Sequence, residues 1–151
     1  MRALLDTNIV FDALCKRPHD EEGLRQMKIV HEFGDVDLWV SAKSYTDLFY
    51  VMRQELGSEA AQNLLEDTLS WLNACSVEEG DVQAALSARW NDFEDCLVNV
   101  CAEKVGADYL VTRDEKGFRN ASIPHGSASD FMQFVFEATN VRYDMVDVLP
   151  S

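Results

Sequence analysis

The chain opens with the stretch ALLDTNIVFD at residues 3–12, in which two apolar segments flank three polar residues. The first apolar segment has the length of a short buried strand. Asp6, Thr7 and Asn8 favour turns and helix caps, and the apolar pattern that resumes at residues 9–14 suits a helix. This stretch therefore predicts a buried strand, a tight turn and a helix.

The same alternation continues along the chain. Helices are predicted over residues 21–33, 42–56, 58–72, 79–89, 92–105 and 131–136, and short strands over residues 38–40, 75–77 and 109–111 and at Ile123. Ser127 and Asp130 form a predicted capping box before the last helix. Short strands separated by helices are typical of βαβ units, whose parallel sheet is covered by helices on both faces. The predicted fold class is therefore α/β, a three-layer α/β/α sandwich with a mainly parallel central sheet.

Length and composition indicate one acidic globular domain. The chain has 151 residues, of which 47% are hydrophobic and 26% charged, which suits one packed core and excludes a disordered chain. We expect a domain over residues 1–138 and an acidic tail over residues 139–151. The formal net charge of -14 argues against broad electrostatic binding to nucleic acid or anionic membranes. A phosphate-bearing partner must therefore be held by local charge.

Cysteines and histidines show no metal-ligand spacing. We interpret the four cysteines as reduced thiols of the core: Cys15, Cys75, Cys96 and Cys101. The scattered histidines argue against a histidine-based metal site: His19, His31 and His125. No apolar run approaches the roughly 18 residues of a membrane span, and Asp6 interrupts the start of the chain where a signal peptide needs apolar residues. We therefore expect a cytoplasmic protein with no membrane partner.

Two acidic residues follow predicted strands. Asp6 ends the first strand, and Asp114 follows the strand at residues 109–111. The carboxyl ends of parallel strands meet at one edge of a sheet, where ligands bind, so both carboxylates are expected in one crevice. Each residue alone could instead form a turn or a cap. Their coincidence favours a functional site.

Asp47 lies in a predicted helix beside the strongly apolar residues 48–52. A buried carboxylate without a partner would be costly or would take up a proton. We therefore expect a cation or a hydrogen-bond donor beside Asp47. The alternative is a partly exposed helix edge.

The helix predicted over residues 92–105 carries a polar stripe. Asp92, Asp95 and Asn99 are spaced i, i+3 and i+7, which places them within an arc of about 60°. Glu94 projects to roughly the opposite side and is interpreted as solvated. Asp95 is the favoured site residue, whereas Asp92 is interpreted equally well as the N-cap of this helix and as a metal ligand or a supporting residue of the site.

Carboxylates that converge in one cleft repel one another. Proteins resolve such repulsion by raising pKa values or by binding a hard divalent cation. Mg²⁺ and Mn²⁺ suit oxygen ligands and can activate water for hydrolysis of a phosphodiester. The acidic residues therefore predict metal-dependent phosphoryl hydrolysis.

Four segments resemble the PIN-domain nucleases in their order and spacing. They are LLDTNIVFD at residues 4–12, SAKSYTD at 41–47, DFEDCL at 92–97 and ADYLVTRD at 107–114. The likeness reaches about Phe131 and is strongest to the small stand-alone bacterial and archaeal branch, which includes toxins of toxin-antitoxin pairs. The ordered set, rather than any single motif, carries the resemblance.

The resemblance implies a Mg²⁺- or Mn²⁺-dependent ribonuclease that cleaves single-stranded RNA. Its catalytic, metal-binding quartet would be Asp6, Asp47, Asp95 and Asp114, with Asp92 as a further candidate ligand. The polar residues that would support the quartet are Thr7, Asn8, Thr112 and, from the helix stripe, Asn99. Family habit also implies a homodimer and, for the toxins, an antitoxin protein as partner.

Three residues qualify the resemblance. The second acid of the family is commonly Glu, whereas Asp47 is one methylene shorter. The doublet of Asp92 and Asp95 leaves open which carboxylate reaches the metal. Asp12 resembles a recurrent family acid, for which we favour a place on the helix surface or a supporting role over direct ligation.

Cationic side chains on segments that flank the crevice are candidates for phosphate binding. The candidates are Arg17, Lys43, Arg113 and Lys116, together with Lys16 and Arg119. Ordinary solubilising charge is the alternative for each of them.

The favoured function is an endoribonuclease, and the main alternative is a PIN-like nucleic-acid or protein binding module without effective catalysis. The strong negative charge and the short Asp47 favour the module, whereas the four retained acids favour the nuclease. An Asp-based phosphotransfer domain would need a lysine after a later strand, a place that Lys116 fits poorly.

Overall fold

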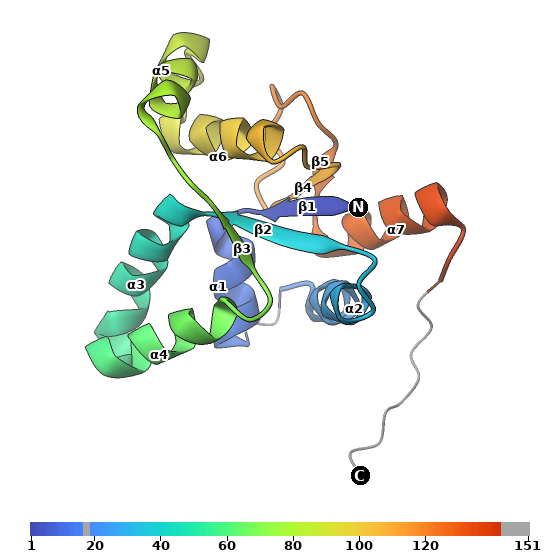
Figure 1. Cartoon of the computed structure of the whole chain (residues 1–151), viewed down its shortest axis with the longest axis horizontal. Helices are drawn as coiled ribbons and strands as arrows, with labels where there is room; N and C mark the ends of the chain where they lie inside the picture. Colours follow the sequence, from blue (N-terminus) through green and yellow to red (C-terminus); the bar gives the residue numbers. More distant parts are fainter. Residues whose placement is uncertain (17–18, 143–151) are drawn as a thin grey trace.

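A five-stranded sheet forms the centre of the computed structural model, which describes residues 1–16 and 19–142 (Figure 1). Its strands are β1 (Arg2–Leu5), β2 (Asp37–Ser41), β3 (Asn73–Cys75), β4 (Tyr109–Val111) and β5 (His125–Gly126). Their order in the sheet is β3-β2-β1-β4-β5, and each neighbouring pair is parallel. The predicted α/β/α sandwich is confirmed.

Seven helices cover the sheet within the described residues. They are α1 (Thr7–Cys15), α2 (Glu21–Glu32), α3 (Ala42–Leu56), α4 (Ser58–Thr68), α5 (Glu79–Ala88), α6 (Phe93–Lys104) and α7 (Ala128–Thr139). Asp6, Ser41 and Asp92 each cap a helix by accepting a hydrogen bond from a backbone N–H of its first turn. Ser127 and Asp130 form the predicted capping box of α7.

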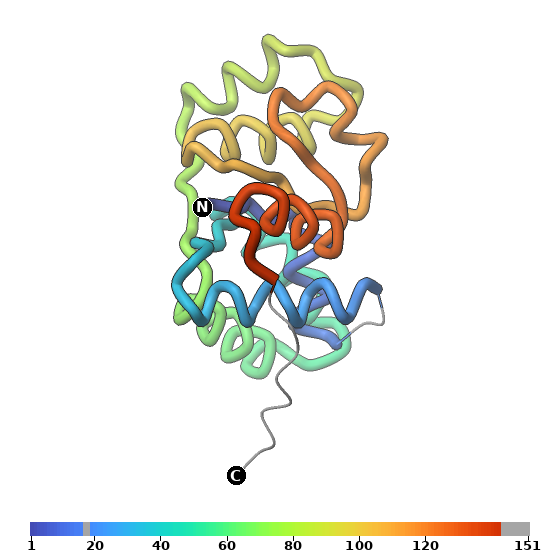
Figure 2. Tube along the Cα trace, turned by 90° about the vertical axis from the view of Figure 1, so that its right-hand side faces the viewer, coloured from blue at the N-terminus to red at the C-terminus, as the bar shows by residue number. Residues whose placement is uncertain are grey.

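Alternate residues of β1 point to opposite faces of the sheet and so define two cores. Ala3 and Leu5 belong to the larger core, which includes residues of α1, α2, α3, α4 and α7. Leu4 belongs to a second core with residues of α6 and with Phe118. Figure 1 and Figure 2 show this division, with α5 and α6 on one side of the sheet and α1 to α4 on the other.

Two short strands are shifted from their predicted places. The third strand ends at Cys75 instead of Val77, and the last strand begins at His125 instead of Ile123. Val77 and Ile123 are partly buried against the second core. Their apolar character therefore comes from packing, whereas the strand bounds are set by pairing with β2 and β4.

Three of the four cysteines are buried thiols as predicted, but Cys15 is exposed because it ends α1 at the surface. The predicted boundary after residue 138 falls inside the last turn of α7, which continues through Thr139. Residues 143–151 of the predicted tail lie outside the described residues. None of the helices in the described residues is long and apolar enough to span a bilayer.

Strand order reverses at β1, which pairs with β2 on one side and with β4 on the other. Ligands of open parallel sheets bind beyond the carboxyl ends of the strands at such a reversal. The backbone N–H of Asp6 donates to the carbonyl oxygen of Val111 at 2.9 Å. The first residues after β1 and β4 therefore lie next to each other.

Candidate functional site

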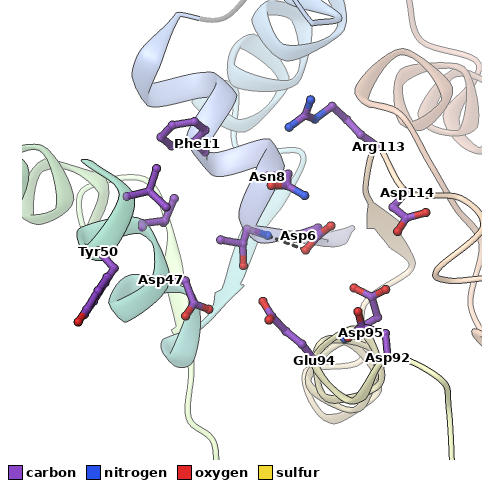
Figure 3. A pocket seen from close by; sticks show the side chains of 13 residues that line it. Asp6, Asn8, Phe11, Asp47, Tyr50, Asp92, Glu94, Asp95, Arg113 and Asp114 are labelled. Atoms are coloured by element: carbon purple, nitrogen blue, oxygen red, sulfur yellow. Dashed lines mark hydrogen bonds between the residues drawn. The ribbon is translucent and has the colours of Figure 1, made fainter. Parts of the chain in front are cut away.

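An acidic pocket of about 700 Å³ opens at this strand reversal. It is lined by all five acids proposed as metal ligands from the sequence and by one further acid: Asp6, Asp47, Asp92, Asp95, Asp114 and Glu94. Figure 3 shows these side chains around one shared space, and they come from the ends of β1 and β4 and from α3 and α6. The fold thus gathers acids that are far apart in the sequence.

Asp6 is held at the base of the pocket by two hydrogen bonds. Its carboxylate accepts from the backbone N–H of Thr7 at 2.7 Å and from the hydroxyl of Thr112 at 2.9 Å. The side chain is buried, and burial raises the pKa of Asp6, with smaller contributions from Glu94 and Asp114, although the two hydrogen bonds act to lower it. Asp6 is therefore a fixed carboxylate whose negative charge is costly.

Thr112 connects Asp6 to Asp114. Its buried hydroxyl donates to Asp6 and accepts a hydrogen bond from the backbone N–H of Asp114 at 3.0 Å. Asp114 in turn accepts from the backbone N–H of Gly117 at 2.9 Å. We call Asp6, Thr112 and Asp114 the strand wall of the pocket, because they follow directly on β1 and β4.

Asp95 enters the pocket from the first turn of α6. Its backbone N–H donates to the carboxylate of Asp92 at 3.1 Å, which confirms Asp92 as the N-cap while leaving it on the pocket lining. Burial raises the pKa of Asp95 to about 7, and the negative charges of Asp92, Asp6, Asp114 and Glu94 add to this effect. The negative charge of Asp95 is therefore costly, chiefly through burial and further through its acidic neighbours.

Gly117 has no side chain, which allows two of these acids to lie close to its backbone. A Cβ at this position would lie less than 3.0 Å from carboxylate oxygens of both Asp95 and Asp114, which is closer than Cβ atoms approach other atoms in proteins. The sequence analysis missed Gly117. A local sequence pattern could have identified it, because a glycine three residues after an aspartate often donates its backbone N–H to that aspartate in a turn.

On the other side of the pocket, Asp47 and Glu94 belong to the lining, and Lys43 pairs with both of them; we call these three residues the helix wall. The Lys43 ammonium lies 2.7 Å from Asp47 and 3.2 Å from Glu94. Burial acts to lower the pKa of Lys43, but the hydrogen bonds to Asp47 and Glu94 outweigh it and raise the pKa. The partner expected for Asp47 is therefore Lys43, one helical turn earlier, and Asp47 still keeps 36% of its side chain exposed.

The interpretation of Glu94 as a purely solvated residue on the far side of its helix was wrong. Its side chain is half exposed, but it lines the pocket and pairs with Lys43. The pocket lies over the N-terminal end of α6, so long side chains around the whole first turn can reach it. The angular spacing of residues around a helix therefore does not predict which side chains reach a pocket at the end of the helix.

Arg113 and Asp12 form an ion pair behind the pocket. The Nε atom of Arg113 lies 2.9 Å from the Asp12 carboxylate, and the Asp12 side chain is only 1% exposed. Arg113 also lines the pocket. Asp12 is therefore not on the helix surface, because α1 directs it inward toward the segment after β4, where Arg113 meets it.

The remaining predicted residues are placed as follows. Thr7 and Asn8 line the pocket, and the Thr7 and Ser44 hydroxyl oxygens lie 2.7 Å apart. Asn99 lies away from the pocket and donates to Glu103 at 3.0 Å, because it is one turn further along α6 than Asp95. Lys116 lines an adjoining groove. Arg17 lies outside the described residues.

The donor set suits a hard divalent cation. In residues 1–16 and 19–142, no three Asp, Glu, His or Cys side chains approach closely enough to bind one ion in this conformation. Asp95 and Asp114 nevertheless both place a carboxylate oxygen beside Gly117, and repulsion between carboxylates contributes to the raised pKa of both Asp6 and Asp95. Oxygen ligands with excess negative charge favour Mg²⁺ or Mn²⁺.

Comparisons with known proteins agree with this architecture. A family model described as PIN domain matches residues 2–116, whereas no curated protein matches significantly. Among solved structures, VapBC2 from Rickettsia felis, bound to a promoter DNA fragment, aligns with a TM-score of 0.65 and 20% identity, over 83% of this chain and 97% of that chain.

Two further structures share the fold. VapBC from Salmonella typhimurium, also bound to DNA, gives a TM-score of 0.62 at 19% identity over 85% of this chain and 98% of that chain. VapC20 from Mycobacterium tuberculosis, a sarcin-ricin loop cleaving toxin, gives a TM-score of 0.59 at 14% identity over 78% of this chain and 94% of that chain. At these identities the likeness concerns the fold alone.

Proposed function

The chain belongs to the PIN domain family, and we propose that it is a metal-dependent endoribonuclease that hydrolyses phosphodiester bonds of single-stranded RNA. The observation that carries the proposal is the convergence of Asp6, Asp95 and Asp114 on one pocket at the strand reversal. Carboxylates that line one pocket and raise one another's pKa, as the charges of Asp6 and Asp114 do for Asp95, are suited to a divalent cation.

Asp6, Asp95 and Asp114 would hold the ion, and a bound Mg²⁺ or Mn²⁺ supplies an activated water and neutralises charge that develops on the phosphate. Thr112 keeps Asp6 and Asp114 at a fixed spacing through its hydroxyl. Asp92 supports the site by capping α6, which sets the position of Asp95. Asp47 contributes a fourth carboxylate from the helix wall, where Lys43 already neutralises part of its charge.

Arg113 is the residue that we propose to contact a phosphate of the substrate. Its guanidinium lines the pocket, and its Nε atom lies 2.9 Å from the buried Asp12 carboxylate, whose oxygens accept no hydrogen bond within the described residues. A guanidinium suits phosphate because its planar N–H donors match phosphate oxygens. Its place in the pocket lining therefore supports a phosphodiester substrate.

An antitoxin protein is proposed as a partner, because the solved relatives include VapBC and FitAB assemblies. Tyr50 and Val51 offer exposed apolar surface at the pocket rim, which suits docking of a peptide. A homodimer rests on the family resemblance, and a cytoplasmic location stays a prediction from the sequence. The single domain over residues 1–138 with a following tail is also part of the proposal.

A binding module without catalysis is the second candidate. It is favoured by the Lys43 ammonium, which engages Asp47 and Glu94 and so leaves three acids of the proposed quartet for an ion. The two functions differ in whether bound metal leads to cleavage, and one experiment separates them.

The test combines cleavage with metal binding. An unstructured labelled RNA is incubated with the protein and Mg²⁺, Mn²⁺ or EDTA, and the metal-induced rise in melting temperature is measured in parallel. Wild type should cleave only with metal, and Asp6→Asn and Asp95→Asn should each reduce cleavage at least about 100-fold and abolish the rise. Asp67→Asn, the same change at an exposed acid of α4, is the matched control.

Three other outcomes are informative. Cleavage that survives in both site variants belongs to a contaminating nuclease and contradicts the proposal. A melting-temperature rise without cleavage favours the binding module. Equal metal-induced rises in melting temperature in wild type and both site variants would contradict the proposed metal site.

A further inference from the structure

A second groove adjoins the acidic pocket on the side of the turn that follows β4. Its volume is about 320 Å³, and it shares Asp92 and Asp114 with the acidic pocket. Beyond these two acids its lining changes character, because it contains Arg89, Lys116 and Arg119. We call this surface the basic groove.

Within residues 1–16 and 19–142, the side chains of the three cations of the basic groove have no ion pair, hydrogen bond or aromatic contact. In the described residues, most other Lys and Arg side chains pair with acids, lie over aromatic rings or donate to a backbone oxygen; these are Arg2, Arg25, Lys28, Lys43, Arg53, Lys104, Arg113 and Arg142. Lys16 is the other cation without such a contact in residues 1–16 and 19–142. Three unpartnered cations in one groove are unexpected in a chain with 27 acids and 13 bases.

An aromatic contact fixes the shape of the groove. Trp90 lines it and packs edge-on against the buried Phe118, with ring centroids 6.3 Å apart. Phe118 lies in the same turn as Lys116 and Arg119, whereas Arg89 precedes Trp90 at the end of α5. The Trp90–Phe118 contact therefore ties the two cationic segments together across the groove.

We propose that the basic groove binds the single-stranded RNA segment next to the bond that is cut, with its cations on phosphates and Trp90 against a base. The inference rests on the proposed nuclease function, since the groove begins where the acidic pocket ends. Arg and Lys side chains on phosphates, with a base stacked on an aromatic ring, are the usual means of binding single strands. An acidic peptide would pair with the cations but would not need an aromatic ring such as Trp90 for stacking.

The test measures binding without cleavage. The probe is a fluorescein-labelled oligouridylate of about 12 nucleotides, and its affinity is measured by anisotropy in EDTA at several salt concentrations. The groove variant carries Arg89→Gln, Lys116→Gln and Arg119→Gln. The control variant carries Arg25→Gln, Lys28→Gln and Arg142→Gln, which remove the same charge from α2 and from the segment after α7.

The groove variant should bind the probe about 10- to 100-fold more weakly than wild type. A plot of log K against log salt concentration should also be less steep, by about 2 in slope, because each lost phosphate contact lowers the slope by roughly 0.7. The control variant should stay within about threefold of wild type, because its cations lie outside the groove. Trp90→Leu should weaken binding about tenfold through lost stacking while leaving the salt slope unchanged. Melting temperatures of all variants establish that they are folded.

Wild-type cleavage of the same probe in Mn²⁺ separates the two proposals. If wild type binds and cleaves but the groove and control variants bind alike, the basic groove is wrong and the nuclease function stands. If wild type neither binds nor cleaves, both fail. If an oligoglutamate peptide binds wild type more tightly than the RNA does, and only the groove variant loses it, the groove is a peptide site and the RNA assignment is overturned.

Discussion

On the strand wall of the acidic pocket, Asp6 and Asp114 share the buried hydroxyl of Thr112, whereas on the helix wall Asp47 and Glu94 share the Lys43 ammonium. The strand wall is set by backbone and hydroxyl hydrogen bonds next to the sheet, and burial makes the negative charge of Asp6 costly. The helix wall is a partly exposed ion-pair network that is already neutralised in part. A pocket can thus join one rigid, electrostatically strained side to one adaptable side.

The largest effect is expected at the space between Asp95 and the strand wall. Gly117→Ala would place a Cβ against the carboxylates of Asp95 and Asp114, and both would have to move. Displacement of reacting groups by about an ångström costs on the order of 100-fold, so cleavage should fall by about this factor. The metal-induced rise in melting temperature should shrink as well.

Gly80→Ala is the matched control, since a Cβ at Gly80 in α5 meets nothing within 4 Å. It should leave cleavage unchanged and stabilise the fold by up to about 1 kcal/mol. Unchanged cleavage and metal response in Gly117→Ala would show that the acids around this space are adaptable, and the contrast between the walls would be lost.

An intermediate effect is expected from Thr112→Val, which breaks the strand wall itself. The valine leaves the Asp6 carboxylate and the Asp114 backbone N–H without their shared partner. The free energy of unfolding should fall by about 1–3 kcal/mol and cleavage by about tenfold. Urea denaturation measures the first quantity, and Thr46→Val, at an exposed threonine of α3, controls for loss of a hydroxyl.

The smallest effect is expected from Lys43→Met, which removes both ion pairs of the helix wall. Because these side chains are a third to a half exposed, the free energy of unfolding should change by less than about 1 kcal/mol. The metal-induced rise in melting temperature should persist or grow, since Asp47 loses its competing cation. Loss of that rise would mean that the two walls depend on each other.

The strand wall could be predicted from sequence because the topology of the sheet determines its position. Parallel strands bring the residues that follow them to one edge, so Asp6 and Asp114 needed only the correct assignment of two strands. The N-cap role of Asp92 followed in the same way from local helix chemistry. These features depend on neighbours in sequence or on the general geometry of a sheet.

Other features depend on tertiary packing and could not be predicted. The pairing of Asp12 with Arg113 joins distant segments, so the sequence alone left open whether Asp12 lies on the helix surface or has a supporting role. The reach of Glu94 into the pocket depends on the end of α6 facing the sheet edge. The bounds of β3 and β5 depend on pairing with neighbouring strands more than on their own apolar residues.

The ion pair of Arg113 and Asp12 has one more consequence. Because its carboxylate partner is fully enclosed by protein, the guanidinium adds almost no net charge to the pocket. Such a group contributes little to long-range attraction and acts through the direction of its N–H donors at short range. Drawing a polyanion toward the protein and aligning it once it arrives would then be tasks of different residues.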